Sequence, residues 1–290
     1  MAVLRAFVTV TCAAALLAAP EPAVTGLDHI PIAVRDLARA TDDYRALGFA
    51  LKPGRRHDDG IQNQHVKFTD GTELELITAT EARDALTATY RRHLERGDGP
   101  AFLALFAPRM PYAAERLAAA KVPHTLHGGA IDFPDGSGLG DLFLSGRNTS
   151  PTDRPEHFAH ANTSQSFVAV WLAADDLSAE RRLLQTLGAT FAEGDARVPD
   201  NVRATVARLD EGEVVFLPAA RQIVPGRRIV GATLRVRSLD TARRILDRGQ
   251  PAPLEVVVTP RGRSVFLPPS RTHGLWLEFR ERTAGSDLDF

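Results

Sequence analysis

The chain has 290 residues, of which 44% are hydrophobic and 24% are charged, so it can bury a sizeable core and form two domains. Its 35 basic and 36 acidic residues give a formal net charge of −1, which provides no electrostatic attraction to nucleic acid or to an anionic membrane. Cys12 is the only cysteine in the sequence, which excludes an internal disulfide.

The N-terminal segment contains an apolar run, Ala6 to Ala19, that follows Arg5. This run is too short to span a bilayer and suits the hydrophobic core of a signal peptide. We therefore predict that residues 1–23 are a signal peptide and that the mature protein is extracytoplasmic or secreted. If the segment is instead an uncleaved N-terminal helix, the protein is expected to be cytoplasmic.

The segment from residue 27 to residue 78 has the order strand, helix, strand, strand, strand. A short apolar run carrying His29 comes first, and an amphipathic helix is expected over residues 38–47, ended by Gly48. After a polar hairpin region, Glu73 and Glu75 alternate with apolar residues in the closing strand. We interpret the segment as one βαβββ module with a candidate metal site.

Three further segments follow the same order, with first strands expected at residues 101–106, 167–172 and 231–236. Their helices are expected at residues 112–120, 177–187 and 241–246. Between the first two segments, residues 80–96 are predicted to form a charged, solvated helix.

The sequence also repeats itself. Asp36-Leu37 recurs as Asp176-Leu177, and Leu47-Gly48 recurs as Leu187-Gly188, both at an offset of 140 residues (176 − 36 and 188 − 48). The turn glycine at 71 recurs at 212, at an offset of 141. Such internal repeats indicate a duplicated architecture.

The predicted fold class is therefore α+β, with four tandem βαβββ modules that form curved mixed sheets around a cleft. The predicted organisation is a first domain at residues 26–147 and a second, degenerate domain at residues 166–282, each made of two modules. Residues 148–165 are the predicted linker, and residues 283–290 a disordered tail. The sequence leaves open whether module one pairs with module two or with module four.

These motifs resemble the vicinal oxygen chelate superfamily, the group of glyoxalases, bleomycin-resistance proteins and extradiol dioxygenases. Residues 26 to about 172 look like its glyoxalase-like domain family, and the second half resembles the superfamily more loosely. The resemblance rests on the strand with His29 and the helix start at Asp36, on Leu47-Gly48, and on the closing strand with Glu75.

In that superfamily the first and last strands of a module supply metal ligands, which implies His29 and Glu75 as ligands here. The fourth segment keeps a carboxylate, Glu278, which would join them if modules one and four pair. The repeat puts Ala169 and Phe216 where His29 and Glu75 stand, and Gly231 replaces the histidine in the fourth segment. The implied cofactor is a divalent ion such as Zn, Fe, Mn or Ni, or no metal at all.

Other polar residues have weaker signals. His57, Gln62 and Asn63 fall in a hairpin that overhangs the cleft in the family, which implies contact with substrate. For His157 and His160 in the linker, turn and capping roles are the favoured interpretation. His124 and His127 are expected to lie on a surface strand rather than at a metal site.

The leading functional prediction is a divalent-metal-dependent enzyme, of the lyase or isomerase type, that acts on a small oxygenated substrate. A dioxygenase is less favoured, because the sequence lacks a second histidine at a matching position. The alternative is a metal-free protein that binds or sequesters a small molecule, as bleomycin-resistance proteins do. The expected partner is thus a small molecule, with no nucleic acid or membrane, and the expected state is a monomer or homodimer.

Overall fold

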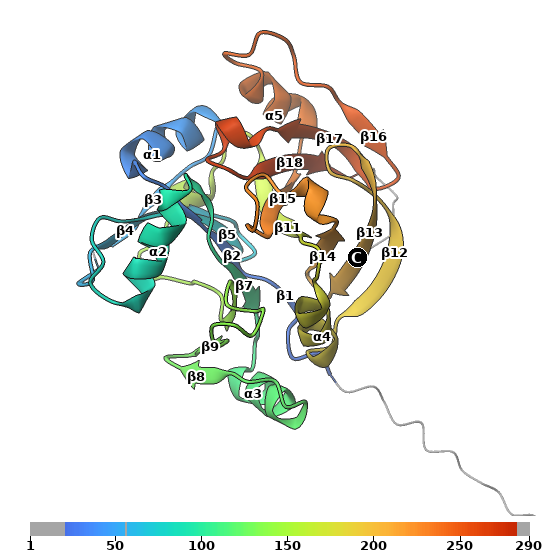
Figure 1. The fold of residues 1–290 in the computed structure, drawn as a ribbon. Coiled ribbons are helices and arrows are strands. Elements are labelled where there is room, and N and C mark those ends of the chain that lie inside the picture. The colour runs from blue at the N-terminus through green and yellow to red at the C-terminus, as the bar shows by residue number, and fades with distance from the viewer. Residues whose placement is uncertain (1–20, 56, 283–290) are drawn as a thin grey trace, which may run out of the picture.

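The computed structural model describes residues 21–55 and 57–282 and contains three β-sheets (Figure 1). The predicted tail at residues 283–290 and most of the predicted signal peptide lie outside the described residues. Within the described part, no helix is long and apolar enough to cross a membrane.

The first half of the chain contains two five-stranded sheets. The first sheet has the strand order β3-β4-β5-β2-β6, and the second has the order β1-β7-β10-β9-β8. Their strands are β1 (Gly26–Leu27), β2 (His29–Ala33), β3 (Lys52–Pro53), β4 (Ile61–Lys67), β5 (Glu73–Ala79), β6 (Gly99–Pro100), β7 (Leu103–Phe106), β8 (Thr125–His127), β9 (Ala130–Asp132) and β10 (Leu142–Ser145).

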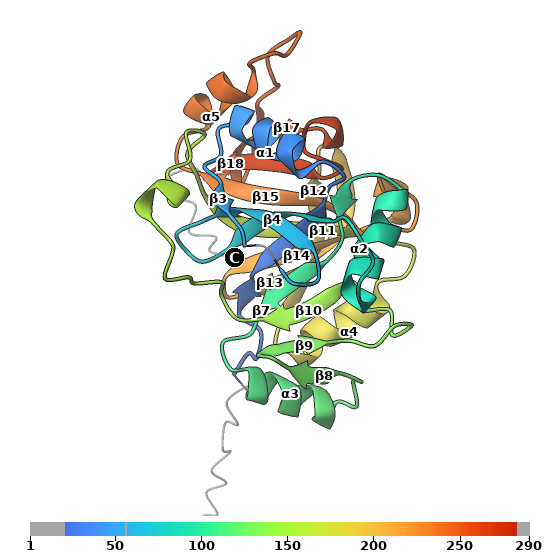
Figure 2. The same ribbon diagram turned by 90° about the vertical axis from the view of Figure 1, so that its left-hand side faces the viewer.

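The two sheets are joined where β1 and β2 run antiparallel to β6 and β7. The backbone N–H of Asp28 donates to Ala104, and that of Ala101 donates to Pro31. Helix α1 (Leu37–Ala46) follows β2, and α3 (Met110–Ala119) follows β7. Figure 2 shows α3 with β8 and β9 at the end of the molecule opposite α5 (Leu239–Leu246).

The second half forms one eight-stranded sheet that curls into a half-barrel (Figure 1), in the order β12-β13-β14-β11-β15-β18-β17-β16. Its strands are β11 (Ser164–Ala173), β12 (Thr190–Arg197), β13 (Asn201–Leu209), β14 (Gly212–Leu217), β15 (Ile229–Val236), β16 (Val257–Thr259), β17 (Gly262–Leu267) and β18 (Trp276–Glu281). Helix α4 (Ser178–Thr186) follows β11, and α5 follows β15. Because β11 pairs antiparallel with β15, the third and fourth predicted segments share this sheet, and the alternative pairing of one with four is wrong.

One large hydrophobic core lies between the halves. Strand alternation sends Leu74 and Leu76 of β5 into it from one side and Leu277 and Phe279 of β18 from the other. The residues that alternate with these point to the opposite side of each sheet, away from the shared core. We call this opposite side of each sheet its inner face. Smaller apolar clusters lie on the two inner faces.

The helix α2 (Ala85–Glu95) corrects the prediction of a solvated helix. It begins with a capping box between Asp84 and Thr87, and its Tyr90 and Leu94 are buried against Ile77 on the inner face of the first sheet. The charged residues of this segment lie on the solvent side of the helix. Its overall composition therefore gave no indication of the apolar residues on the other side.

The structure also corrects the alignment of the repeat. In the sheets Lys67 pairs with Glu73 and Arg208 pairs with Glu213, so the offset is 141 before the hairpin turn (208 − 67) and 140 after it (213 − 73). A slip of one residue exchanges the faces of a strand. The counterpart of Glu75 is thus the inner-face residue at 215, whereas Phe216 packs in the shared core.

The neighbour of Gly231 explains why a glycine stands where the first segment has His29. A Cβ atom added there would lie 2.0 Å from the ring of Trp171, which is buried on the inner face of the second half. A side chain as large as histidine is therefore incompatible with the indole at this position.

Candidate functional site

The inner face of the first sheet carries a buried cluster of polar side chains. The parallel strands β2 and β5 place His29 opposite Glu73 and Pro31 opposite Glu75. Period-two alternation turns His29, Glu73 and Glu75 to the same side, away from the shared core. Glu73 and Glu75 are buried, which excludes a solvated strand face.

His29 lies between two carboxylates. Its Nδ1 is 2.9 Å from Oδ2 of Asp28, and its Nε2 is 3.8 Å from Oε2 of Glu75. Burial alone would lower the pKa of His29, but the hydrogen bond to Asp28 and the charges of Asp28, Glu75 and Glu73 raise the pKa to about 9. In this arrangement the imidazole is a cation at neutral pH, and the pair to Asp28 fixes the ring orientation.

Glu75 is oriented by a neighbouring strand. The Nδ2 of Asn63 donates to Oε1 of Glu75 over 2.6 Å, so the other carboxylate oxygen remains directed at His29. The Oδ1 atom of Asn63 is buried and has no hydrogen-bond partner among the described residues. Asn63 thus belongs to the cluster, and its predicted contact with substrate stays a prediction.

Asp28 is held by residues from the end of β10. The hydroxyl of Ser145 donates to Oδ2 of Asp28, and Nη1 of Arg147 lies 4.0 Å from Oδ1. Asp28 is fully buried, and its Oδ1 accepts no hydrogen bond within the described part of the chain. A buried carboxylate oxygen without a donor is costly, and a bound cation would remove that cost.

A second imidazole–carboxylate pair lies beside the first. His65 Nδ1 is 3.2 Å from Oε1 of Glu73, and Asn148 of the linker donates to the same carboxylate over 3.1 Å. Burial raises the pKa of Glu73, but the hydrogen bond to His65, the charge of His29 and the Asn148 amide together hold that pKa below its usual value. Glu73 is therefore held as a carboxylate by its contacts with His65 and Asn148.

An aromatic row encloses the cluster. The ring of Phe143 packs edge-on against His29 at 5.4 Å, Phe102 packs against Phe143, and Tyr90 of α2 packs against Phe102. Burial and the charge of Glu75 raise the pKa of Tyr90 well above its usual value, so its hydroxyl remains protonated. This row therefore packs against His29 on the same face as the buried carboxylates.

The other predicted substrate residues are more peripheral. Gln62 neighbours Asn63 on β4, so alternation turns it to the opposite face of the sheet. His57 lies in the loop before β4, where its backbone N–H donates to Ile61. Its Nε2 is buried without a hydrogen-bond partner among the described residues.

Glu278 does not converge with His29 and Glu75. It lies on the inner face of the second half, where Arg280 donates through Nη2 to its Oε2 over 2.8 Å. Thr233 and Ser264 also donate to this carboxylate, and burial, which raises its pKa, is outweighed by Arg280, so the pKa is lowered. Over residues 21–55 and 57–282, no group of three or more His, Cys, Asp or Glu side chains could hold a metal ion.

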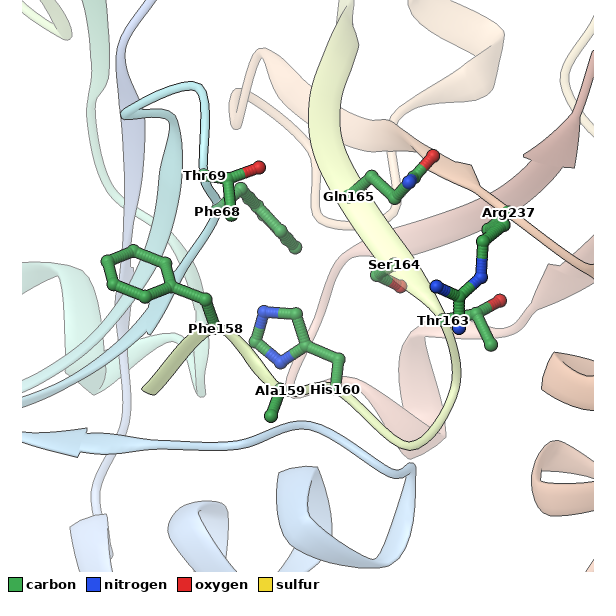
Figure 3. A pocket seen from close by; sticks show the side chains of 9 residues that line it. All are labelled: Phe68, Thr69, Phe158, Ala159, His160, Thr163, Ser164, Gln165 and Arg237. Atoms are coloured by element: carbon green, nitrogen blue, oxygen red, sulfur yellow. The ribbon is translucent and has the colours of Figure 1, made fainter. Parts of the chain in front are cut away.

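Of the linker histidines, His157 has the predicted turn role, whereas His160 connects the linker to Ala50 and Lys67. His157 accepts the N–H of Arg154 at the start of a 3₁₀ turn. His160 accepts the N–H of Ala50 on Nδ1, and its Nε2 lies 2.9 Å from the carbonyl of Lys67. Figure 3 shows His160 at a cavity of about 440 Å³ between the halves, with the Arg237 side chain beside Thr163.

His124 and His127 lie away from the cluster. His127 is exposed and pairs with Asp132, which fits the predicted surface strand. Nδ1 of His124 lies 2.9 Å from the carbonyl of Val122.

Comparison with solved structures identifies the class of fold. The chain resembles a mutant of 4-hydroxymandelate synthase from Streptomyces coelicolor, with a TM-score of 0.63 and 14% identity over 90% of this chain and 93% of that one. It also resembles a catechol 2,3-dioxygenase, with a TM-score of 0.61 and 15% identity over 90% and 88% of the two chains. A hypothetical protein from Staphylococcus aureus gives a TM-score of 0.59 at 13% identity, over 89% of this chain and all of that one.

At such low identity these likenesses show the fold alone, which is that of the vicinal oxygen chelate superfamily. The model of the glyoxalase-like domain family matches residues 27–188, which is more than half of the chain. The protein therefore belongs to the glyoxalase-like domain family. Among curated proteins it is 28% identical over 264 residues to Protein XP55 from Streptomyces lividans, across 84% of this chain. The matched region spans only 45% of that relative.

Several residues of the cluster escaped the sequence analysis. Asp28 immediately precedes His29, and His65 follows Asn63 at the period of a strand, so both had a detectable signal. Ser145 is 117 residues away from Asp28, and Asn148 in the linker is 75 residues away from Glu73. Only the fold brings these two residues to the site.

Proposed function

We propose that the inner face of the first sheet holds a divalent metal ion between His29 and Glu75. The protein would then be a metal-dependent enzyme, of the lyase or isomerase type, acting on a small oxygenated substrate. The observation that carries the proposal is the 3.8 Å between Nε2 of His29 and Oε2 of Glu75. Two ligands of one transition-metal ion, each about 2.1 Å from it, lie roughly 3 to 4 Å apart.

The charge of the cluster supports a cation. Asp28, Glu73 and Glu75 are buried together, and the nearest guanidinium, that of Arg147, also pairs with Glu211. Carboxylate oxygen and imidazole nitrogen are donors that suit Mn, Fe, Zn or Ni. The Oδ1 atoms of Asp28 and Asn63, which accept no hydrogen bond among the described residues, are consistent with room for a further cation.

The residues around the ion would divide the work. A bound divalent ion would supply a Lewis acid that polarises a carbonyl or binds adjacent oxygens. Asp28 fixes the ring of His29 through Nδ1, and Asn63 fixes Glu75 through Oε1. His65 and Glu73 hold a proton between Nδ1 and Oε1 and are our candidates for proton transfer. The aromatic row excludes water from the reacting atoms.

Metal binding tests the proposal directly. We would strip the purified full-length protein with a chelator and measure the binding of Mn²⁺ and Zn²⁺ by equilibrium dialysis. We expect about one ion per chain in the wild type and in Glu278→Gln, and loss of that ion in the isosteric Glu75→Gln. Retention of the ion by Glu75→Gln, or its loss in Glu278→Gln alone, would refute the assignment.

The alternative is a metal-free protein that binds a small, hydrophobic molecule on the same face. It is favoured by the apolar lining that Ile61, Ile77, Tyr90 and Phe102 provide beside the polar cluster. In this case the stripped wild type takes up no ion, and His29→Ala leaves ligand binding unchanged.

We further propose that the chain is built from four βαβββ modules in two domains, residues 26–147 and 166–282. In all three sheets the first strand of a module lies beside its last strand, and this recurring order supports the proposal.

Export remains a proposal as well. The backbone N–H of Ala23 donates to Leu187, and Pro22 packs on Gly188, so these two residues of the predicted signal peptide, 1–23, pack on the fold, and we propose a boundary before Glu21 instead. The partner would be a small molecule, and the protein a monomer or homodimer.

A further inference from the structure

A second cavity, of about 280 Å³, lies where α2 meets the segment that precedes β15. Four arginines line it, two from α2 and two from the second half: Arg92, Arg96, Arg227 and Arg228. Pro100, Ala101 and Ile229 supply an apolar part of the wall. The cavity is thus bounded by both halves of the molecule and is separate from the cluster around His29.

Arg227 is the buried base of this cavity, with only 8% of its surface exposed. Its Nη1 donates to the carbonyl of Asp98, and its Nη2 donates to His93 and Gly97, at the C-terminal end of α2. The Nε of Arg227 is buried and has no hydrogen-bond partner among the described residues. A buried guanidinium N–H without an acceptor points to a group that is absent from the bare protein.

Acidic residues compensate the positive charge of the cavity only in part, because Asp141, which also lines the cavity, pairs with Arg228. Within the described part of the chain, Arg92, Arg96 and Arg227 make no ion pair with a carboxylate, whereas Arg228 pairs with Glu180 and Asp141. Burial and the charge of Arg96 lower the pKa of Arg227, as expected where cations repel one another.

His93 adds a further nitrogen. Its Nε2 is buried without a hydrogen-bond partner in the described structure. Burial and the charge of Arg227 lower the pKa of His93 to about 4, so the ring is neutral near pH 7. Among the described residues, two buried nitrogens without a hydrogen-bond partner and three guanidiniums without an ion pair therefore surround one small space, which Asp141 also lines.

We propose that this cavity binds a phosphate group, either free or as the monoester of a small molecule. A phosphate carries up to two negative charges and several acceptor oxygens, which matches donors that approach from α2 and from the second half. A carboxylate has one charge and two acceptors, and would leave more of the guanidinium charge unpaired. The cavity exceeds a phosphate ion in size, and its apolar wall leaves room for the esterified part.

Inorganic phosphate is the probe for the test. We would measure thermal unfolding and calorimetric binding with the chelator-stripped full-length protein, with chloride at matched ionic strength as the baseline. We expect the wild type to show a saturable rise in Tm with phosphate, and acetate to give a much smaller rise. Stripping removes any metal that phosphate could ligate, so the result does not depend on the proposed metal site.

Two variants locate the effect. In Arg92→Gln/Arg96→Gln we expect phosphate affinity to fall about tenfold or more, because two charge-assisted donors are lost. Arg91→Gln is the matched control, since Arg91 lies on the same helix but donates to the carbonyl of Thr80 outside the cavity. If the double variant is not folded, Arg92→Gln alone serves, because the Arg92 side chain is exposed.

Three results would overturn the proposal. They are a wild type that responds to phosphate no more than to chloride, an equal response to acetate, and an equal loss of affinity in Arg91→Gln.

Discussion

The inner faces of the two halves carry the same kind of acid but different counter-charges. On the first, Glu73 and Glu75 are approached by imidazoles and amides, with His65 and Asn63 as direct partners. On the second, Glu213 is paired with Arg261 and Glu278 with Arg280. Guanidinium carries a permanent charge and has no lone pair to offer.

The carboxylates of the second inner face are already neutralised by arginines, whereas those of the first inner face could still be neutralised by a bound cation. An imidazole can lose its proton and become a ligand, whereas Arg280 occupies the counter-charge position beside Glu278 in every protonation state. The second half therefore fits a scaffold whose acidic residues are structural, and the proposed metal site belongs to the first half.

The largest effect on stability is expected from removing the arginine that neutralises Glu278. Arg280→Met leaves Glu278 buried without its cation, and we expect a loss of about 3 kcal/mol in the free energy of unfolding, measured in urea. Replacing both residues, in Arg280→Met/Glu278→Leu, should recover most of the loss, because the buried charge is removed as well.

Arg203→Ala calibrates this result within the same sheet. Its guanidinium lies 3.9 Å from Asp195, but both side chains are at least 70% exposed, so the loss should stay below about 0.5 kcal/mol. Equal losses in Arg203→Ala and Arg280→Met would show that burial does not distinguish the two pairs.

The second prediction concerns the first half and rests on its proposed metal site. Asp28→Asn keeps the size of the side chain but removes the charge that orients His29. We expect cation affinity to fall about 10- to 100-fold at unchanged stoichiometry, measured by competition with a chelating dye. Glu211→Gln, which alters only an exposed partner of Arg147, should leave the affinity unchanged. Wild-type affinity in Asp28→Asn would mean that Asp28 does not orient the ligand.

Much of the first face was predictable because its signals are local. Alternation around Glu75 and the strand with His29 identified two side chains that the structure brings to 3.8 Å, and Gly48 and Gly188 follow their helices with φ values of +86° and +108°. The spacing of Thr87, Tyr90 and Leu94 on α2 was also readable, but the surrounding charges favoured the wrong interpretation.

The rest depends on contacts that are distant in the chain. The pairing of β11 with β15 is decided by which sheet edges meet, and no local pattern encodes it. The one-residue difference between the hairpin turns moved Phe216 to the wrong face in the alignment, because a strand tolerates no shift of register. Glu278 had the same local pattern as Glu75, and only Arg280 distinguishes its environment.

The smallest effect is expected from His273, a second histidine between two carboxylates. It extends from the second half to the first, where Nδ1 lies 2.8 Å from Asp98 and Nε2 lies 3.1 Å from Asp43. Burial lowers its pKa, but the hydrogen bonds and charges of Asp98 and Asp43 outweigh burial, so the pKa is raised. A raised pKa in the folded state stabilises the protein fully below the unfolded value of about 6.5, and the contribution is lost as the pH rises through the folded value.

His273→Gln should therefore cost about 1 kcal/mol of unfolding free energy at pH 6 and less at pH 9, measured by urea unfolding at both values. His124→Gln is the control, because Nδ1 of His124 faces a backbone carbonyl and the substitution removes no contact with a carboxylate. Unlike His29, His273 joins two half-buried acids on the boundary between the halves, so its charge couples the halves without enclosing a site. An equal loss at both pH values would show that the His273 contacts act through packing and not through the imidazolium charge.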